Sequence, residues 1–227
     1  MKVHVPLDGI VSAVALLGGT GKLGRGLALR WAPKERVIIG SRFRGKAEDA
    51  AAEVRQTLGG ASAGNVRGML NREAIEEADL VVFCIKLEPA LRLAKRRRKS
   101  LMGKLILSPV VAMRRKGNLR VPKLKPSTSA ALRLANVLGQ RSRVVAGLHT
   151  IPAAMLYSKE PLGDYSVVVY GEQPAKGVVM QLVREIEGLH PLDGGPLEMS
   201  FLSEYTTALL LNLGILNQRR GYSVKYY

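Results

Sequence analysis

A glycine-rich turn between an apolar run and a helix-like segment constrains the fold of this chain most strongly. The apolar run is Val14 to Leu17, and a second one, Arg36 to Ile39, follows the helix-like segment. Gly19, Gly21 and Gly24 fit the spacing G-x-G-x-x-G. In that spacing the first glycine permits a tight turn, the second lets the backbone approach a pyrophosphate, and the third lets the helix pack on the strand. The pattern predicts a Rossmann-type dinucleotide-binding unit, with the pyrophosphate at the helix N-terminus.

The end of the second apolar run predicts which dinucleotide binds. An NAD site places a carboxylate there to hold the ribose 2′-hydroxyl, but no carboxylate follows the end of this run until Glu48. The residues that stand there instead are Ser41, Arg42, Arg44 and Lys46. A guanidinium binds phosphate in a fork, and one such bond contributes roughly 1.5–3 kcal/mol, so we expect a roughly tenfold to hundredfold preference for NADP. A solvated basic loop is the alternative.

Lys22 stands in the first turn of the predicted helix. A cation there opposes the helix macrodipole, at a cost of about 0.3 kcal/mol or more. A docked anion would remove that cost, whereas a side chain extended into water is the alternative interpretation.

Composition and cysteine usage bound the class of protein. With 47% apolar and 23% charged residues, the chain is not globally disordered and can bury a core. Cys84 is the only cysteine, which excludes an internal disulfide and a zinc cluster and favours a cytoplasmic location; we expect it to be a buried strand residue. Ala208–Leu216 is interrupted by Asn212 and too short to span a bilayer, and Met1–Gly9 lacks the apolar core of a signal peptide. Neither a membrane partner nor a metal site is predicted.

The net charge of +17 indicates an anionic partner. The densest basic run is Lys95 to Lys99, with Arg92 upstream, at the end of a predicted helix. A solvated helix end is one interpretation, because cations there suit the helix dipole; a docking surface for an acidic cofactor tail is a second. Nucleic acid is the least favoured partner, because the run lacks interleaved aromatic residues.

Strand and helix candidates alternate through residues 1–148, which predicts right-handed βαβ crossovers and a parallel sheet. The further strand candidates are Val66–Leu70, Leu80–Ile85, Leu105–Leu107 and Arg143–Leu148. The helix candidates are Leu23–Ala32, Lys46–Leu58, Arg72–Ala78 with Asn71 as its cap, a helix from Glu88, and Ser129–Leu138. The basic, proline-containing stretch Arg114–Pro126 is predicted to be a loop. Ligands should lie beyond the carboxyl ends of the strands.

The pattern changes after Pro152, and we expect residues 149–227 to form a smaller α/β domain for the acceptor site and dimerisation. Its candidates are a strand at Tyr165–Tyr170, a helix at Lys176–Glu187, a turn-rich stretch with a short strand at Gly188–Leu197, and an apolar helix at Ser200–Asn217. That last helix carries more leucine than one small domain covers, which favours a homodimer; an internally buried helix is the alternative.

The chain resembles the NADPH-dependent reductases of coenzyme F420, the F420:NADP oxidoreductases. The segments that carry the resemblance are Leu17–Gly21 with Gly24 and Gly26, Gly40–Arg42, Leu148–Ala154, Glu187–Leu189 and Pro191–Leu197. The resemblance implies a Rossmann domain with a small C-terminal domain, a homodimer, and hydride transfer between NADP and the deazaflavin F420.

Carried over by position, the resemblance also implies where each substrate binds. Thr20, Ser41, Arg42 and Lys46 would surround the 2′-phosphate, and Gly21, Lys22 and Leu23 would lie against the pyrophosphate. With the motif glycines Gly19 and Gly24 and the strand ends, the predicted NADP-binding residues are Gly19, Thr20, Gly21, Lys22, Leu23, Gly24, Ser41, Arg42, Lys46, Ile85 and Ser108. The predicted acceptor-binding residues are His149, Ile151 and Pro152.

Hydride transfer between two rings needs approach and exclusion of water more than acid–base chemistry from the protein. We therefore expect no catalytic triad, and name no residue as catalytic. Two rival hypotheses stay open: an NADPH-dependent reductase of FMN, FAD or ferric ion with the same fold, and a non-catalytic NADP-binding regulator.

Overall fold

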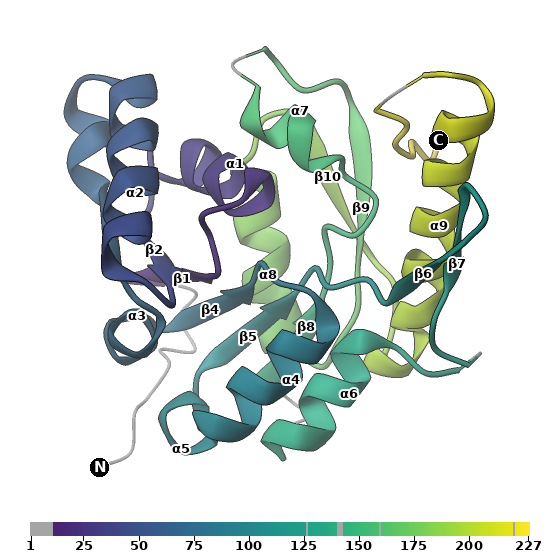
Figure 1. The fold of residues 1–227 in the computed structure, drawn as a ribbon, viewed down its shortest axis with the longest axis horizontal. Helices are drawn as coiled ribbons and strands as arrows, with labels where there is room; N and C mark the ends of the chain where they lie inside the picture. The colour runs from purple at the N-terminus through teal and green to yellow at the C-terminus, as the bar shows by residue number, and fades with distance from the viewer. Residues whose placement is uncertain (1–10, 126, 140–142, 159, 220) are drawn as a thin grey trace.

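A parallel sheet of six strands, in the order β3-β2-β1-β4-β5-β8, forms the centre of the molecule (Figure 1). The computed structural model describes residues 11–125, 127–139, 143–158, 160–219 and 221–227, so the stretch Met1–Gly9 lies outside them. The strands are β1 (Val14–Leu17), β2 (Val37–Ser41), β3 (Val66–Leu70), β4 (Leu80–Phe83), β5 (Leu105–Ser108) and β8 (Val144–Ala146). Because β1 pairs with both β2 and β4, the strand order reverses beside the glycine turn. The predicted fold class is confirmed.

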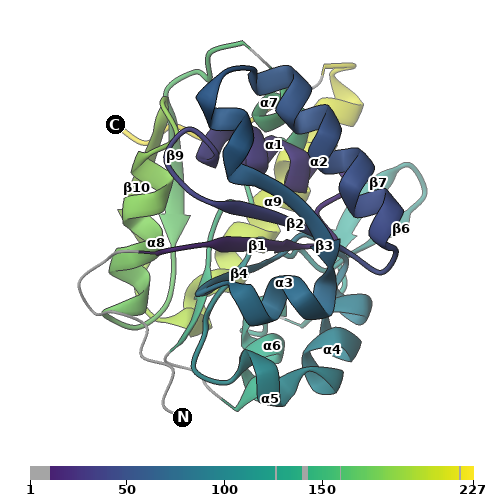
Figure 2. The same cartoon turned by 90° about the vertical axis from the view of Figure 1, so that its left-hand side faces the viewer.

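Helices cover both faces of this sheet (Figure 2). One face is covered by α1 (Lys22–Trp31), α2 (Arg44–Leu58) and α8 (Ala175–Arg184). The other is covered by α3 (Asn71–Glu77), α4 (Leu87–Arg96), α5 (Arg98–Leu101) and α6 (Ala130–Leu138). Every residue of β1, β4 and β5 is buried, which explains why these strands are unbroken apolar runs in the sequence.

The residues after β8 add a smaller parallel sheet and a long helix. They form α7 (Ala153–Tyr157), β9 (Tyr165–Val169), β10 (Leu189–Asp193), a 3₁₀ helix (Leu197–Ser200) and α9 (Phe201–Leu216). β9 pairs in parallel with β10, and Tyr170 forms an antiparallel bridge with Ala146 at the end of β8. The Trp31 indole on α1 donates to the Leu182 carbonyl at 2.9 Å. The C-terminal elements thus pack into the same core as α1, and a domain boundary near residue 149 stays a prediction.

The stretch expected to be a loop contains a β-hairpin, so that prediction was wrong. β6 (Met113–Lys116) and β7 (Leu119–Pro122) pair antiparallel, and Gly117 has a φ of +60° in the turn between them. The Asn212 side chain on α9 accepts from the backbone N–H of Arg120 at 2.7 Å and donates to its carbonyl at 2.8 Å. This contact from a distant helix supports the hairpin, whereas its charged residues and prolines weakened the strand signal. Pro126 lies outside the described residues.

Two local predictions about the sheet edges were also wrong. Asn71 does not cap α3 from outside; it is the first residue of the helix, and its Oδ1 accepts from the backbone N–H of Gly18 at 3.2 Å. β4 ends at Phe83, so half-buried Cys84 lies just beyond the strand. Both differences bring side chains to the edge where ligands are expected.

Helix α9 has more apolar surface than the other described residues bury. Helical structure from Leu197 to Leu216 covers 20 residues with a mean hydropathy of 1.2, and 22% of the most apolar window is buried. By length and composition alone this stretch could cross a membrane, so judging only Ala208–Leu216 underestimated it. Much of the apolar surface of this helix is therefore exposed in the part of the chain that the structure describes.

Candidate functional site

The glycine turn after β1 leaves an open face at the start of α1. Gly18 has a φ of +67°, a conformation that favours glycine. A Cβ at Gly24 would lie 2.3 Å from the Cα of Gly19, so α1 packs directly on the turn. A Cβ at Gly21, in contrast, would meet no atom within 4 Å. The packing role predicted for Gly24 agrees with this geometry, whereas the approach of a pyrophosphate to Gly21 stays a prediction.

A hollow of about 730 Å³ opens beside this turn, and we call it the cationic pocket. Its walls come from the glycine turn, the ends of β2 and β4, helix α4 and the segment after β5. The charged residues that line it are Arg42, Lys46, Lys86, Arg92 and Arg96, and among the described residues no carboxylate lines it. Its volume is of the size that binds cofactors, and its charge selects an anionic one.

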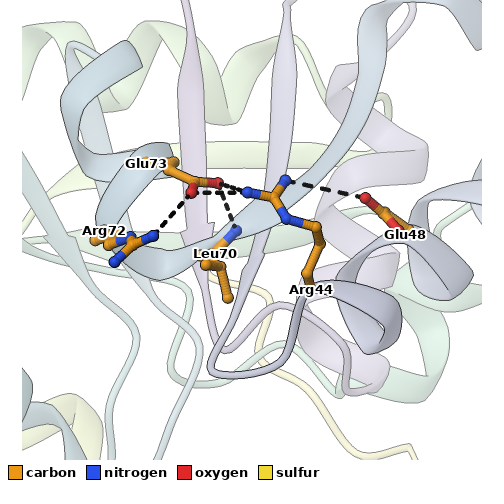
Figure 3. A network of polar contacts seen from close by, with 5 residues as sticks. All are labelled: Arg44, Glu48, Leu70, Arg72 and Glu73. Carbon is orange, nitrogen blue, oxygen red and sulfur yellow. Dashed lines mark hydrogen bonds and ion pairs between the residues drawn. The ribbon is translucent and has the colours of Figure 1, made fainter.

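The basic residues near β2 fall into paired and unpaired ones. Arg44 contacts Glu73 at 2.7 Å and 2.8 Å and approaches Glu48 at 4.0 Å, while Arg72 lies 3.6 Å from Glu73 (Figure 3). This network neutralises Arg44, which does not line the pocket. The five cations of the cationic pocket, however, form no ion pair with another described residue. Unpaired cations facing one hollow fit a ligand with several phosphate charges.

Phe43 adds an aromatic surface to this pocket. Its side chain is 57% exposed, although large aromatic side chains are usually buried. The Arg42 guanidinium lies 5.8 Å and the Lys46 ammonium 5.4 Å from the ring centroid. The ring therefore holds both cations beside the pocket, and it offers a face on which a base can stack.

Six of the predicted NADP-binding residues line the cationic pocket: Thr20, Leu23, Ser41, Arg42, Lys46 and Ile85. Gly19 and Gly24 shape the turn beneath it, and Gly21 and Lys22 stand exposed at the start of α1. Ser108 is fully buried, with no partner for its hydroxyl, and Pro109 and Val110 line the pocket in its place. Ser108 thus lies beneath the pocket wall.

A second hollow, of about 580 Å³, lies against α9, and we call it the apolar pocket. Two regions distant in sequence line it: His149 to Ala153 after β8, and one face of α9 from Thr207 to Ile215 together with the residues that follow the helix, Gln218, Arg219, Gly221 and Tyr222. The predicted acceptor residues His149, Ile151 and Pro152 come together here. The tail residue Arg220 lies outside the described residues. This pocket suits a flat, largely apolar ring.

His149 is the buried polar group of the apolar pocket. Its side chain is 6% exposed, and neither ring nitrogen has a hydrogen-bond partner among the described residues. Burial lowers the pKa of His149 to about 4, so the imidazole is neutral at pH 7. The Thr207 hydroxyl donates to the His149 carbonyl at 3.0 Å and so fixes the backbone. A ligand with both donor and acceptor groups would satisfy this ring.

The two pockets lie beyond the carboxyl ends of two neighbouring strands. β5 pairs with β8, and the segment after β5 lines the cationic pocket while the segment after β8 lines the apolar pocket. The Glu204 carboxylate on α9 accepts from the backbone N–H of Ala112 at 3.2 Å and of Ala130 at 2.6 Å. Burial raises the pKa of Glu204 to about 7, against the opposing effect of these two bonds. Glu204 therefore ties α9 to the segment that closes the cationic pocket.

Helix α7 connects the wall of the apolar pocket to helix α1. It begins directly after Pro152 and packs on α1, where a Cβ at Gly26 would lie 2.8 Å from the Cβ of Leu156. The Arg30 guanidinium on α1 donates to the carbonyls of Leu156 at 3.1 Å and Ser158 at 2.8 Å. These bonds satisfy carbonyls at the end of α7. The helix that begins at the glycine turn thus also positions the wall of the apolar pocket.

A glycine turn, an open helix N-terminus and a cationic pocket at the carboxyl ends of parallel strands define the class: a Rossmann-type dinucleotide-binding protein. A family model described as "NADP oxidoreductase coenzyme F420-dependent" matches residues 13–112.

Known proteins extend the similarity to nearly the whole chain. The F420-dependent NADP reductase of Methanocaldococcus jannaschii is 34% identical over 93% of this chain and 96% of its own. The one from Methanothermobacter thermautotrophicus is 33% identical over 95% of both chains. A solved structure of a candidate F420-dependent NADP reductase from an Arthrobacter species has a TM-score of 0.79 at 22% identity, covering 96% of this chain and all of that one. The chain belongs to the family of coenzyme F420-dependent NADP oxidoreductases, as the resemblance predicted.

Sequence reasoning missed residues that line both pockets. Asn71 and Phe43 line the cationic pocket, and one face of α9 lines the apolar pocket. The α4 arginines were considered as a docking surface for an acidic cofactor tail, but not as part of the nucleotide pocket that they line. The spacing of Arg92 and Arg96, four residues apart on one helical face, was a usable signal. The sequence carries no such signal for the pocket-lining face of α9, because leucines occur on all sides of this helix.

Proposed function

We propose that the chain is an F420-dependent NADP reductase, which transfers hydride between NADPH bound in the cationic pocket and F420 bound in the apolar pocket. The observation that carries this proposal is that the segments after the paired strands β5 and β8 line the cationic pocket and the apolar pocket, respectively. Curated relatives that match almost the whole chain are named for this reaction. The reaction balances as NADPH + F420 + H⁺ → NADP⁺ + F420H₂.

The residues of the chain bind and orient the two substrates. Arg42, Ser41 and Lys46 hold the 2′-phosphate, and the open N-terminus of α1 at Gly21 and Lys22 receives the pyrophosphate. Pro109 and Val110 bring an apolar wall to the junction, where the two rings approach within about 3–3.5 Å. No metal and no protein nucleophile is needed, because the two rings carry the electronic chemistry.

His149 positions the deazaflavin ring as a neutral imidazole. One ring nitrogen donates and the other accepts, so His149 can satisfy both kinds of group on a ring edge. Because the pKa of His149 lies at about 4, it does not supply the proton at neutral pH.

The direct test mixes the purified chain with NADPH and F420 and follows the loss of deazaflavin absorbance. We expect bleaching with NADPH and much slower bleaching with NADH. If NADPH binds but only FMN, FAD or ferric ion accepts electrons, the chain is a flavin or ferric reductase. If no acceptor oxidises NADPH and nucleic acid binds in a salt-sensitive way, the chain is a regulator.

We also propose that α9 forms a homodimer interface and that residues 149–227 combine acceptor binding with dimerisation. Leu202, Leu209 and Leu216 recur every seven residues and are 45%, 57% and 67% exposed. This spacing forms an apolar seam along one side of a helix, as at helix–helix interfaces. Leu209→Glu should convert a dimer to a monomer in light scattering, whereas Leu192→Glu, on β10 and 40% exposed, should not. A monomeric parent chain would contradict the interface.

A cytoplasmic location forms part of the same proposal. If α9 pairs with a second copy, the chain is recovered without detergent as a dimer. Recovery only from membranes would instead mean that a lipid phase covers the helix.

A further inference from the structure

Helix α4 presents a row of cations to the cationic pocket that the motifs near β2 do not include. Lys86, Pro89, Arg92, Leu93 and Arg96 all line this pocket and recur at three- and four-residue intervals. Residues spaced in this way lie on one face of a helix. The face that α4 turns toward the pocket is therefore basic at the end of the helix.

Neither arginine on this face has a carboxylate as its main partner. Neither Arg92 nor Arg96 forms an ion pair with a described residue. Glu88 lies one turn before Arg92, but its carboxylate contacts the Lys123 ammonium at 2.7 Å. Lys123 is also the main cause of the lowered pKa of Glu88, to which Arg92 contributes least. Both arginines are thus available to an anion in the pocket.

The other residues of the basic run do not line the cationic pocket. Arg98 donates to the Leu138 carbonyl at 3.1 Å, at the end of α6. Lys95, exposed and beside Arg96 in sequence, does not line the pocket. The helix dipole favours cations on every side of a helix end, so it does not explain why Arg92 and Arg96 line the pocket while Lys95 does not. This difference in position indicates a ligand for Arg92 and Arg96.

We propose that Arg92 and Arg96 bind the 2′-phosphate of NADPH from the α4 wall of the cationic pocket and so determine specificity for NADPH over NADH. This inference rests on the proposed function, since it assigns further residues to the same nucleotide site. α4 packs on one face of the sheet and α2, whose first turns carry Lys46, on the other. The phosphate is then held between two walls, with Arg42 and Lys46 on one and the two α4 arginines on the other.

The test compares Arg92→Ala, Arg96→Ala and the double variant with Lys95→Ala, which removes the same charge from the same helix. Dissociation constants are measured by calorimetry for NADPH, NADH, 2′,5′-ADP and 5′-AMP. Because exposed charge pairs contribute up to about 1 kcal/mol, we expect about fivefold weaker NADPH binding for each single variant and about twentyfold for the double. Binding of 2′,5′-ADP should weaken in parallel, while NADH and 5′-AMP change less than about twofold. Arg96→Lys should recover part of the loss.

Three results show whether the inference, the proposed nucleotide site or both are wrong. Equal losses for NADPH and NADH would overturn the specificity role. A double variant that behaves like Lys95→Ala would overturn the inference, while a parent chain that still prefers NADPH leaves the proposed nucleotide site standing. A parent chain with no preference for NADPH would overturn both. Thermal melts of all variants should coincide, because neither side chain is buried.

Discussion

The cationic pocket and the apolar pocket differ in how they are built. The cationic pocket takes its residues from several strand ends, the glycine turn and α4, and its cations form no ion pairs with other described residues. The apolar pocket takes its residues from two regions, the segment after β8 and α9 with the residues that follow it, around a buried, neutral histidine. We propose that the first pocket recognises the charge of the nucleotide and the second the shape of the deazaflavin ring. A single chain joins them through neighbouring strands and through Glu204.

The first prediction separates folding from binding within the glycine turn. Gly24→Ala places a Cβ 2.3 Å from the Gly19 backbone, which cannot rotate away, so we expect a loss of about 3 kcal/mol in unfolding free energy. Gly21→Ala places its Cβ in open space and should leave stability unchanged while weakening NADPH binding. Denaturant unfolding and nucleotide titration of both variants give the comparison. Equal stability of the two variants would contradict the packing role of Gly24.

A second prediction concerns acid and the apolar pocket. The pKa of His149 is lowered to about 4, so between pH 6.5 and 4 the unfolded chain binds a proton that the folded chain does not. The stability contributed by the neutral imidazole is therefore complete above pH 6.5 and is lost as the pH falls toward 4, by about 3 kcal/mol. His149→Leu should show a smaller loss over this range in urea unfolding. Parallel pH profiles for the two proteins would mean that His149 is not buried in the neutral form.

The third prediction tests charge recognition by the cationic pocket. Arg42→Ala should weaken NADPH binding about tenfold or more and leave NADH binding almost unchanged, since only NADPH carries the 2′-phosphate. Arg44→Ala is the matched control, because Arg44 is neutralised by Glu73 and does not line the pocket. If the two variants lose the same NADPH affinity, the division into paired and unpaired cations is wrong.

These two pockets also show what sequence can and cannot predict. β1 and β3 have the predicted bounds, and the Gly19 turn and Arg42 were readable because their residues are adjacent in sequence and obey local geometry. The hairpin β6–β7 and the pocket face of α9 depend on contacts such as Asn212 with Arg120, 92 residues apart. Local propensity carries no signal for such contacts. His149 was identified from its family motif, and only the structure shows that its ring is buried without partners.

The fourth prediction tests shape recognition by the apolar pocket. His149→Leu removes two unsatisfied ring nitrogens, so stability at pH 7 should stay equal or rise. The KM for F420 should rise about tenfold, as expected for one lost hydrogen-bonding group, while NADPH affinity stays unchanged. Steady-state kinetics and NADPH titration check the two halves of this prediction. A loss of NADPH affinity would show that the pockets are not separate.

The smallest expected effect concerns Lys22 at the start of α1. Lys22→Gln removes a cation that opposes the helix dipole, so the free protein should gain about 0.3 kcal/mol. NADPH affinity should fall by about the same free energy or somewhat more, because the pyrophosphate loses a nearby charge. Thermal unfolding with and without NADPH measures both changes. A variant that gains stability with unchanged affinity would place Lys22 in solvent.

A crystal structure of the chain with NADP⁺ and F420 together tests most directly which substrate each pocket binds. The account predicts the 2′-phosphate against Arg42 and Lys46 in the cationic pocket, the deazaflavin ring against His149 in the apolar pocket, and the reacting carbons about 3–3.5 Å apart beside Pro109. A deazaflavin bound away from His149, or an adenosine end outside the reach of Arg42, would contradict it.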